Sequence, residues 1–135
     1  MHDPPRPLQH ILRLIGGIAF IGAGLNHFRS MAFYERIIPP GFPSPHRLVI
    51  ISGLCEIAGG IGLLIPRLRR PAGIGLIALL VAVFPANLYM AAHPEQFSDM
   101  DIPRWGFRLR LPLQALFIAW VWYAAVKRPR RQTRR

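Results

Sequence analysis

Residues 48–65 read LVIISGLCEIAGGIGLLI, and Cys55 and Glu56 are the only ionisable side chains in this stretch. A second stretch, residues 72–92, has Tyr89 as its only ionisable side chain. As helices rising about 1.5 Å per residue, both are long enough to cross the ~30 Å hydrocarbon core of a bilayer. Runs of this length with so few charges are exceptional in water-soluble domains, so they predict membrane-spanning helices.

Similar runs lie on either side of these two, which predicts a single domain of 135 residues with an all-α fold, a bundle of four transmembrane helices. Strands are not expected, because backbone groups in lipid require helices or a closed barrel, and no alternating pattern is present. We expect spans over residues 8–28, 47–65, 72–92 and 109–126, followed by a basic tail over residues 127–135.

The chain carries a net charge of +11, and its bases lie in short segments between the apolar runs. A nucleic-acid binder needs its bases on one water-facing surface, so we expect no nucleic-acid partner. In a chain of four spans both termini and the second-to-third loop share one side. That side carries eleven bases, and the other side carries six: Arg29, Arg36, Arg47, Arg104, Arg108 and Arg110. The richer side is expected to be cytoplasmic, and with it both termini.

Several polar side chains lie within the spans, although an ionisable group near mid-membrane costs roughly 2.5–3.5 kcal/mol or more. Neighbouring spans run in opposite directions, so these residues all fall in the outer half of the bundle. Glu56 is the deepest of them. The others are Asn26, His27, Asn87, Arg110 and Gln114. This layer predicts a polar pocket, in which Glu56 approaches His27 or Arg110 because an unpaired carboxylate at that depth is too costly.

Helical spacing gives the second span one face of small and polar residues, at i, i+3, i+4, i+7 and i+8: Ser52, Cys55, Glu56, Gly59 and Gly60. Small residues let helices approach closely, so this face is expected to be a helix–helix seam in which Cys55 is a packing residue. In the third span, Pro85 should kink the helix and free a carbonyl near Asn87.

Aromatic residues cluster near the expected ends of the spans. Residues 33–43 mix aromatics with prolines and are expected to lie along the membrane interface as a loop. The usual role of Trp and Tyr at such depths is to anchor a span at the interface. We expect that role for Trp105, Trp120, Trp122 and Tyr123.

Four motifs in these polar regions resemble those of bacterial DoxX-like membrane proteins. They read GLNHF (24–28), SGLCEIAGGIGLL (52–64), FPANLYM (84–90) and RLPLQ (110–114), and the resemblance covers nearly the whole chain. It implies a multi-pass protein of the bacterial inner (plasma) membrane with four helices. That family takes its name from a subunit associated with quinone-linked oxidoreductases, so the resemblance also implies a quinone as a possible ligand.

The leading hypothesis is a membrane subunit or binding protein for a quinone-like or other lipophilic molecule. Glu56 and His27 would handle a proton or bond a ligand carbonyl, as they would in an enzyme using them as acid–base groups. Five further residues are expected to bind the ligand: Asn26, Asn87, Tyr89, Arg110 and Gln114. A structural role for these residues, in a scaffold for partner membrane subunits or a second copy, is the remaining alternative.

Metal binding is the weaker interpretation of the same polar residues. His27, Glu56 and His93 form a ligand set known for metals, two imidazoles and a carboxylate. No short spacing ties these three together, so no metal site is expected.

Overall fold

A computed structural model of the chain describes residues 6–128, which form helices joined by short loops and contain no strand. Residues 129–135 of the expected basic tail lie outside this range. The elements are α1 (Pro7–Arg29), α2 (Met31–Ile37), α3 (Pro45–Leu64), α4 (Arg69–Ala82), α5 (Phe84–Ala92), the 3₁₀ turn η1 (Pro94–Phe97), α6 (Arg104–Val121) and the π-helical turn η2 (Trp122–Val126).

Within the described residues, four helices are long and apolar enough to cross a membrane: Pro7–Arg29, Pro45–Leu64, Arg69–Ala92 and Arg104–Val126. Their outward faces are apolar, with Ile18, Ile51, Val81 and Leu116 each more than half exposed. Such surfaces suit lipid and not water. The chain is a multi-pass membrane protein, and the predicted four-helix fold is confirmed.

The helix that contains the fourth span is longer than the expected apolar run, which starts at about residue 109. The helix begins five residues earlier, at Arg104, directly after Pro103. Helix formation requires internal hydrogen bonds and not apolar side chains, so α6 continues past the apolar run with Arg104 and Arg108 exposed on its first turns.

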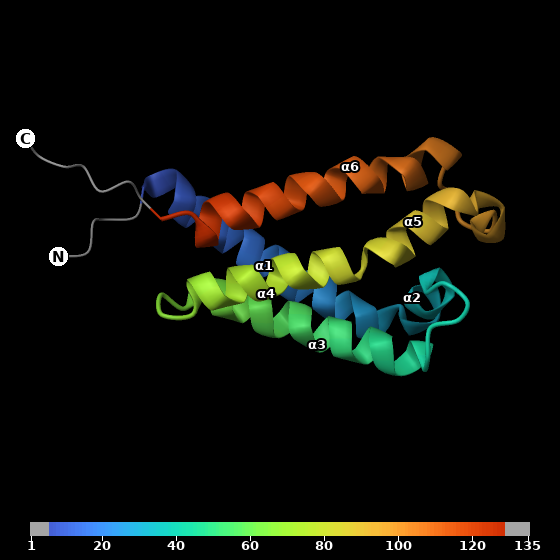
Figure 1. Cartoon of the computed structure of the whole chain (residues 1–135), viewed down its shortest axis with the longest axis horizontal. Coiled ribbons are helices and arrows are strands. Elements are labelled where there is room, and N and C mark those ends of the chain that lie inside the picture. Colours follow the sequence, from blue (N-terminus) through green and yellow to red (C-terminus); the bar gives the residue numbers. More distant parts are fainter. Residues whose placement is uncertain (1–5, 129–135) are drawn as a thin grey trace, which may run out of the picture.

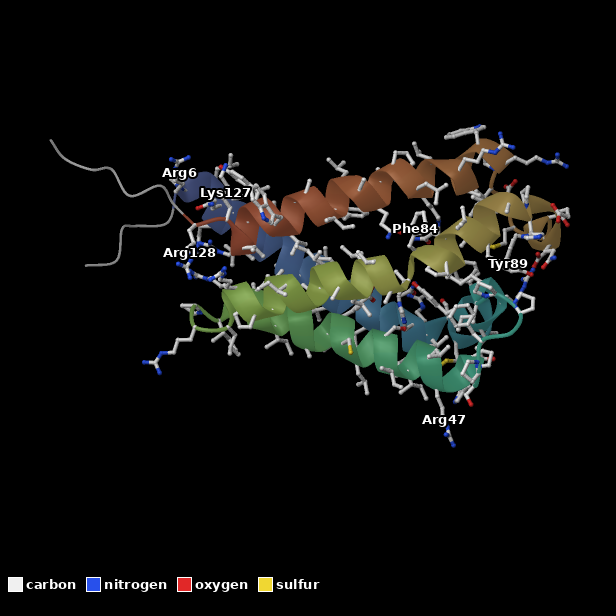
Figure 2. The ribbon with its side chains drawn as sticks, viewed as in Figure 1. Arg6, Arg47, Phe84, Tyr89, Lys127 and Arg128 are labelled. Carbon is white, nitrogen blue, oxygen red and sulfur yellow. The ribbon has the colours of Figure 1, made fainter. Side chains whose placement is uncertain are left out.

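The four spans run alternately up and down the bundle (Figure 1). Arg6, at the start of the described chain, lies at the same end as Lys127 and Arg128 (Figure 2). The opposite end carries α2 and the segment 93–103 (Figure 1). We call these the terminal end and the α2 end. Both described ends of the chain lie at one end of the bundle, as an even number of spans requires.

The tightest helix contact in the bundle is a glycine seam between α1 and α3. A Cβ atom on Gly17 would lie 2.9 Å from the carbonyl oxygen of Gly60, and one on Gly24 would lie 2.6 Å from that of Gly53. Each helix supplies two glycines seven residues, or two turns, apart, and the pairing is antiparallel. Only glycine permits backbones this close, so the seam fixes how α1 and α3 pack.

The single face predicted for the second span is divided between several neighbours. A Cβ atom on Gly59 would clash with Leu76 of α4, whereas Gly60 faces α1. Cys55 is exposed, so the prediction that it packs in a seam was wrong. A stripe of residues at i, i+3, i+4, i+7 and i+8 is wide enough to touch two helices at once.

The third span is broken at Val83 into α4 and α5, which differ in direction (Figure 1). Pro85, the second residue of α5, has no backbone N–H and therefore cannot continue the helical hydrogen bonds. The carbonyl oxygen of Leu80, one turn before α5, accepts a hydrogen bond from the Gln114 side chain of α6. The kink predicted from Pro85, with its free carbonyl in the polar layer, is confirmed.

The α2 end is closed by packed side chains. Ile37 of α2 joins Met90, Phe97 and Phe107 in one buried cluster. Residues 33–43 were expected to form an interfacial loop. Residues 33–37 are instead helical, because they belong to α2, which packs on the bundle. Seven residues followed by prolines show too little periodicity for this helix to be predicted.

Candidate functional site

A cavity of about 840 Å³ lies between the spans. Every one of the four spans contributes to its wall, and the wall is mostly apolar. Gly16, Trp120 and Val121 line it toward the terminal end, while Tyr34 and Phe42 line it at the α2 end. Its volume falls within the range of sites that hold a small organic ligand.

Polar atoms meet in this cavity at two places, the first of which is the pair His27 and Glu56. Nε2 of His27, near the end of α1, lies 3.1 Å from Oε2 of Glu56, in the middle of α3. The expectation that Glu56 approaches His27 or Arg110 is thereby confirmed. The contact is close but not an aligned hydrogen bond, and Oε2 is buried without a hydrogen-bond partner in residues 6–128. The Glu56 side chain lines the cavity, while Oε2 itself is enclosed beside His27.

The other ring nitrogen of His27 is held by α3. Nδ1 lies 3.2 Å from the carbonyl oxygen of Val49 and 3.1 Å from Oγ of Ser52. Oγ of Ser52 itself donates to the same carbonyl, so both oxygens act as acceptors toward Nδ1. Nδ1 therefore carries a hydrogen, and the imidazole is oriented with Nε2 toward Glu56.

One proton shared between Nε2 of His27 and Oε2 of Glu56 would turn this contact into a hydrogen bond. The pair is either imidazolium with carboxylate or imidazole with carboxylic acid, and its net charge is zero in both forms. A proton given to a ligand would leave the pair with one net negative charge, and a proton taken from a ligand would leave it with one net positive charge, so the ligand must carry the balancing charge among these apolar side chains.

Tyr34 of α2 covers the histidine from the α2 end. Its ring lies 4.0 Å from the His27 ring, centroid to centroid, with an angle of 30° between the planes. Nδ2 of Asn26 donates to the hydroxyl of Tyr34 over 3.1 Å. Asn26 itself is exposed and does not line the cavity, so it positions Tyr34 and does not face a ligand directly.

The second polar group joins α5, α6 and α4. Nδ2 of Asn87 donates to Oε1 of Gln114 over 2.7 Å, and Nε2 of Gln114 donates to the carbonyl of Leu80. Both side chains line the cavity, as expected from the sequence. Gln114 is 5% exposed, and these two hydrogen bonds fix the orientation of its side-chain amide. The kink at Val83 supplies the free carbonyl that makes this chain of hydrogen bonds possible.

Arg110 also lines the cavity, one turn before Gln114 on α6. No ion pair joins it to Glu56 within residues 6–128, because His27 occupies the carboxylate instead. The Arg110 guanidinium is thus placed as a separate cationic group at the wall.

Tyr89 was expected at the site and lies elsewhere. Its hydroxyl donates to Oε1 of Gln96 over 2.6 Å, and its ring stacks on His93 at 4.6 Å. Figure 2 shows Tyr89 at the α2 end of the bundle, and it does not line the cavity. Because Tyr89 lies one turn beyond Pro85 on α5, its side chain faces the segment 93–103 and not the cavity.

The three candidate metal ligands do not come together. His93 faces the carbonyl of Tyr89 and does not line the cavity that holds His27 and Glu56. In the part of the chain that the structure describes, no group of three or more His, Cys, Asp or Glu side chains could hold a metal ion.

Two residues of the site were not predicted from the sequence. Trp120 lines the cavity, and its Nε1 donates to the carbonyl of Leu12 over 3.1 Å, so its assignment as an interfacial anchor was wrong. Tyr34 was missed because α2 was not recognised as a helix. Nε1 of Trp120 would lie 3.6 Å from a Cβ atom on Gly16 of α1, a contact between two spans that leaves no local signal in the sequence.

One protein family matches the chain, over residues 17–125, and it is described as a domain of unknown function (DUF8561). The chain belongs to the DUF8561 family. No curated protein and no solved structure matches it. The DUF8561 region contains every residue that lines the cavity except Gly16, so the cavity is built within the domain that defines the family.

Proposed function

We propose that this protein binds a quinone-like or other lipophilic, amphipathic molecule in the cavity between its spans. The observation that carries the proposal is the combination of an apolar wall with two oriented polar groups, His27–Glu56 and Asn87–Gln114, in about 840 Å³. Protein interiors are close-packed, and a void costs stability in proportion to its volume. A bundle selected for packing alone would gain by closing this space.

The cavity residues divide into distinct roles. The His27–Glu56 dyad exchanges a proton with the ligand or bonds its carbonyl. Arg110 attracts a negatively polarised oxygen. Asn87 and Gln114, locked by their mutual hydrogen bond and by Leu80, orient the ligand. The apolar remainder of the wall accommodates the ring or tail.

A second candidate function is an enzyme acting on a lipophilic substrate. The His27–Glu56 contact favours it, because an imidazole paired with a carboxylate is a common general acid–base arrangement. The same cavity serves both functions. Turnover of a quinone-like or lipid substrate by purified protein would favour the enzyme, and retention without turnover favours binding alone.

The cellular setting belongs to the same proposal. The resemblance to DoxX-like proteins supports a place in the bacterial inner membrane and association with a quinone-linked oxidoreductase. Eleven bases against six support cytoplasmic termini. The apolar faces that the spans expose are surfaces for contact with lipid, with a partner membrane subunit or with a second copy of the chain. A scaffold with no ligand is the outcome expected if the cavity proves to bind nothing.

The test is a mass-spectrometric inventory of the small molecules retained by the protein in mild detergent. We expect one lipophilic compound, enriched over the bulk membrane extract, in the wild type. A Gln114→Leu variant removes an orienting side chain and should lose that compound. Ser98→Ala, at an exposed position outside the cavity, is the control and should retain it. Retention of only bulk lipids in all three proteins would contradict the proposal.

A further inference from the structure

Arg13 is a buried cation at the terminal end, away from the cavity. It lies on α1 and is 7% exposed. Its Nη1 donates to the carbonyl of Ala124 in η2 over 3.0 Å, while Nε and Nη2 are buried without a partner in the described residues. One hydrogen bond to a helix end therefore uses only part of a guanidinium that has been removed from water.

Arg69, the first residue of α4, meets the same region. Its Nε is also buried without a described partner, and the side chain is partly exposed. One turn later on the same face, a Cβ atom on Gly73 would lie 2.8 Å from Ala125 of η2. Both arginines thus converge on η2, close enough for their like charges to repel each other.

The described carboxylates lie away from these two arginines. Glu56 is bound to His27 in the cavity. The other described acidic side chains belong to the α2 end, on α2, η1 and the segment that follows: Glu35, Glu95, Asp99 and Asp101. A buried cation, Arg13, beside a half-buried one, Arg69, without a counter-charge destabilises a fold, so an anion from outside the described residues would stabilise it.

We propose that Arg13 and Arg69 form a binding site for a phosphate group, supplied by a lipid headgroup or by free phosphate. A guanidinium presents a planar fork of donors that matches phosphate oxygens, and the three unpartnered nitrogens come from two such forks. Arg13 lies six residues after Pro7, about 9 Å along the helix, which is the depth at which a span meets lipid headgroups. Arg69 provides the accessible side of the site.

The experiment measures thermal unfolding of the full chain, delipidated in a neutral maltoside detergent. The probes are inorganic phosphate, against chloride at equal ionic strength, and a short-chain phosphatidic acid. Arg69→Gln removes one fork, and Arg70→Gln removes the same charge from the adjacent, exposed arginine as a matched control. Arg13→Lys keeps the charge and removes the fork.

We expect the wild type and Arg70→Gln to unfold at a higher temperature with a phosphate probe. Arg69→Gln should bind that probe about tenfold more weakly. Without any probe it should unfold at the wild-type temperature or above, because one of two repelling charges is gone. A rise with both probes shows that the phosphate group alone suffices, and a rise with the lipid alone identifies a headgroup site.

Three results would overturn the proposal. The wild type could respond to neither probe beyond chloride. Arg69→Gln and Arg70→Gln could lose the response equally, which indicates a diffuse basic surface. Arg69→Gln could also be less stable than the wild type by the same amount with and without phosphate, which indicates a purely structural arginine. If Arg13→Lys does not fold, the Arg69 and Arg70 variants decide the question alone.

Discussion

Glu56 and His27 stabilise each other in a place where neither is favourable alone. An ionisable side chain near mid-membrane costs roughly 2.5–3.5 kcal/mol or more, and burial of an isolated carboxylate among apolar groups is costlier still. His27 reduces this cost because Nε2 approaches Oε2 within 3.1 Å. Oε2 is buried beside His27 without an aligned hydrogen bond in the described residues, and both side chains line the cavity.

Substitution of Glu56 separates a structural role from a functional one. Glu56→Gln keeps the shape and removes the charge, so we expect assembly and thermal stability within about 1 kcal/mol of the wild type. Ligand retention should fall by about tenfold or more, because the amide cannot exchange a proton with His27. Glu56→Leu should lose retention as well. Thermal unfolding in detergent, measured beside retention by mass spectrometry, checks both effects.

Glu95→Gln is the control for this comparison, since it removes one exposed carboxylate outside the cavity and should change neither quantity. A Glu56→Gln protein that retains its ligand fully would leave only the structural role for the His27–Glu56 pair.

Asp99 provides a pH-dependent contact at the α2 end. Arg36 donates to both carboxylate oxygens of Asp99, each over 2.9 Å, and these hydrogen bonds hold the pKa of Asp99 below its ordinary value of 3.8. A lowered folded-state pKa means that the stabilisation is fully present above the unfolded pKa and is lost as the pH falls through the folded pKa.

We therefore expect wild type to unfold at a higher temperature than Asp99→Asn at about pH 5, and this difference to shrink below about pH 3.8. Parallel melting curves of the two proteins across that range give the measurement. A difference that stays constant down to about pH 3 would show that the Arg36–Asp99 pair does not titrate in this way.

Site residues could be predicted from the sequence where their depth in the membrane alone determines which other residues lie near them. His27, Glu56, Asn87, Arg110 and Gln114 were placed in one layer from the direction of their spans, and all line the cavity. Tyr89 and Asn26, which were also expected to bind the ligand, do not line the cavity, because the depth of a residue does not specify the side of the helix on which it lies. Rotation of a span about its axis depends on the packing of its neighbours, which a single sequence does not show.

Glycine positions determine how the helices α1 and α3 pack. Gly24→Ala would place a Cβ atom 2.6 Å from the carbonyl oxygen of Gly53, so the helices must separate. We expect a loss of about 1–3 kcal/mol in the free energy of unfolding. Gly22 lies on the same helix with nothing within 4 Å of an added Cβ, so Gly22→Ala is the matched control.

Gly22→Ala should be neutral or stabilise the protein by up to about 1 kcal/mol, through helix propensity alone. Thermal or denaturant unfolding of both variants in one detergent gives the comparison. Equal effects of the two substitutions would show that the α1–α3 contact does not depend on glycine.

The lengths of the spans could be read from the sequence because charges and prolines end the apolar runs. The first three spans begin within three residues of the expected positions, and Arg69–Ala92 ends at the expected residue. The helix α6 begins five residues before the expected start of the fourth span, because its first turns are polar. The helix α2 was missed because its stability comes from burial of Ile37 against α5, η1 and α6, a tertiary contact with no local signature.

The orientation of the whole bundle is predicted by its charges. The terminal end carries Arg6, Arg67, Arg70, Lys127 and Arg128, and we expect it to face the cytoplasm. Reporter fusions after Arg135 and within residues 94–103 check this. A cytoplasmic signal after Arg135 and a periplasmic one from the loop are expected, and the reverse pattern would contradict the assignment.

The cavity requires all four spans, since each contributes to its wall. The glycine seam holds α1 on α3, the kink at Val83 directs α5 toward the α2 end, and α2 covers His27. Figure 1 shows α6 diverging from α1 toward that end. The hydrogen bonds between these two helices, or between α1 and η2, lie toward the terminal end, as in the bond from Trp120 to Leu12.

Trp120 lines this space, whereas Trp105 is 68% exposed, so the chain contains its own reporter and control for ligand binding. Two single-tryptophan proteins, one keeping Trp120 and the other keeping Trp105, are titrated in detergent with a short-chain ubiquinone analogue, which quenches indole fluorescence on contact. We predict saturable quenching of Trp120 and only linear, non-saturable quenching of Trp105. Linear quenching of equal slope in both proteins would contradict the proposal that the cavity binds such a molecule.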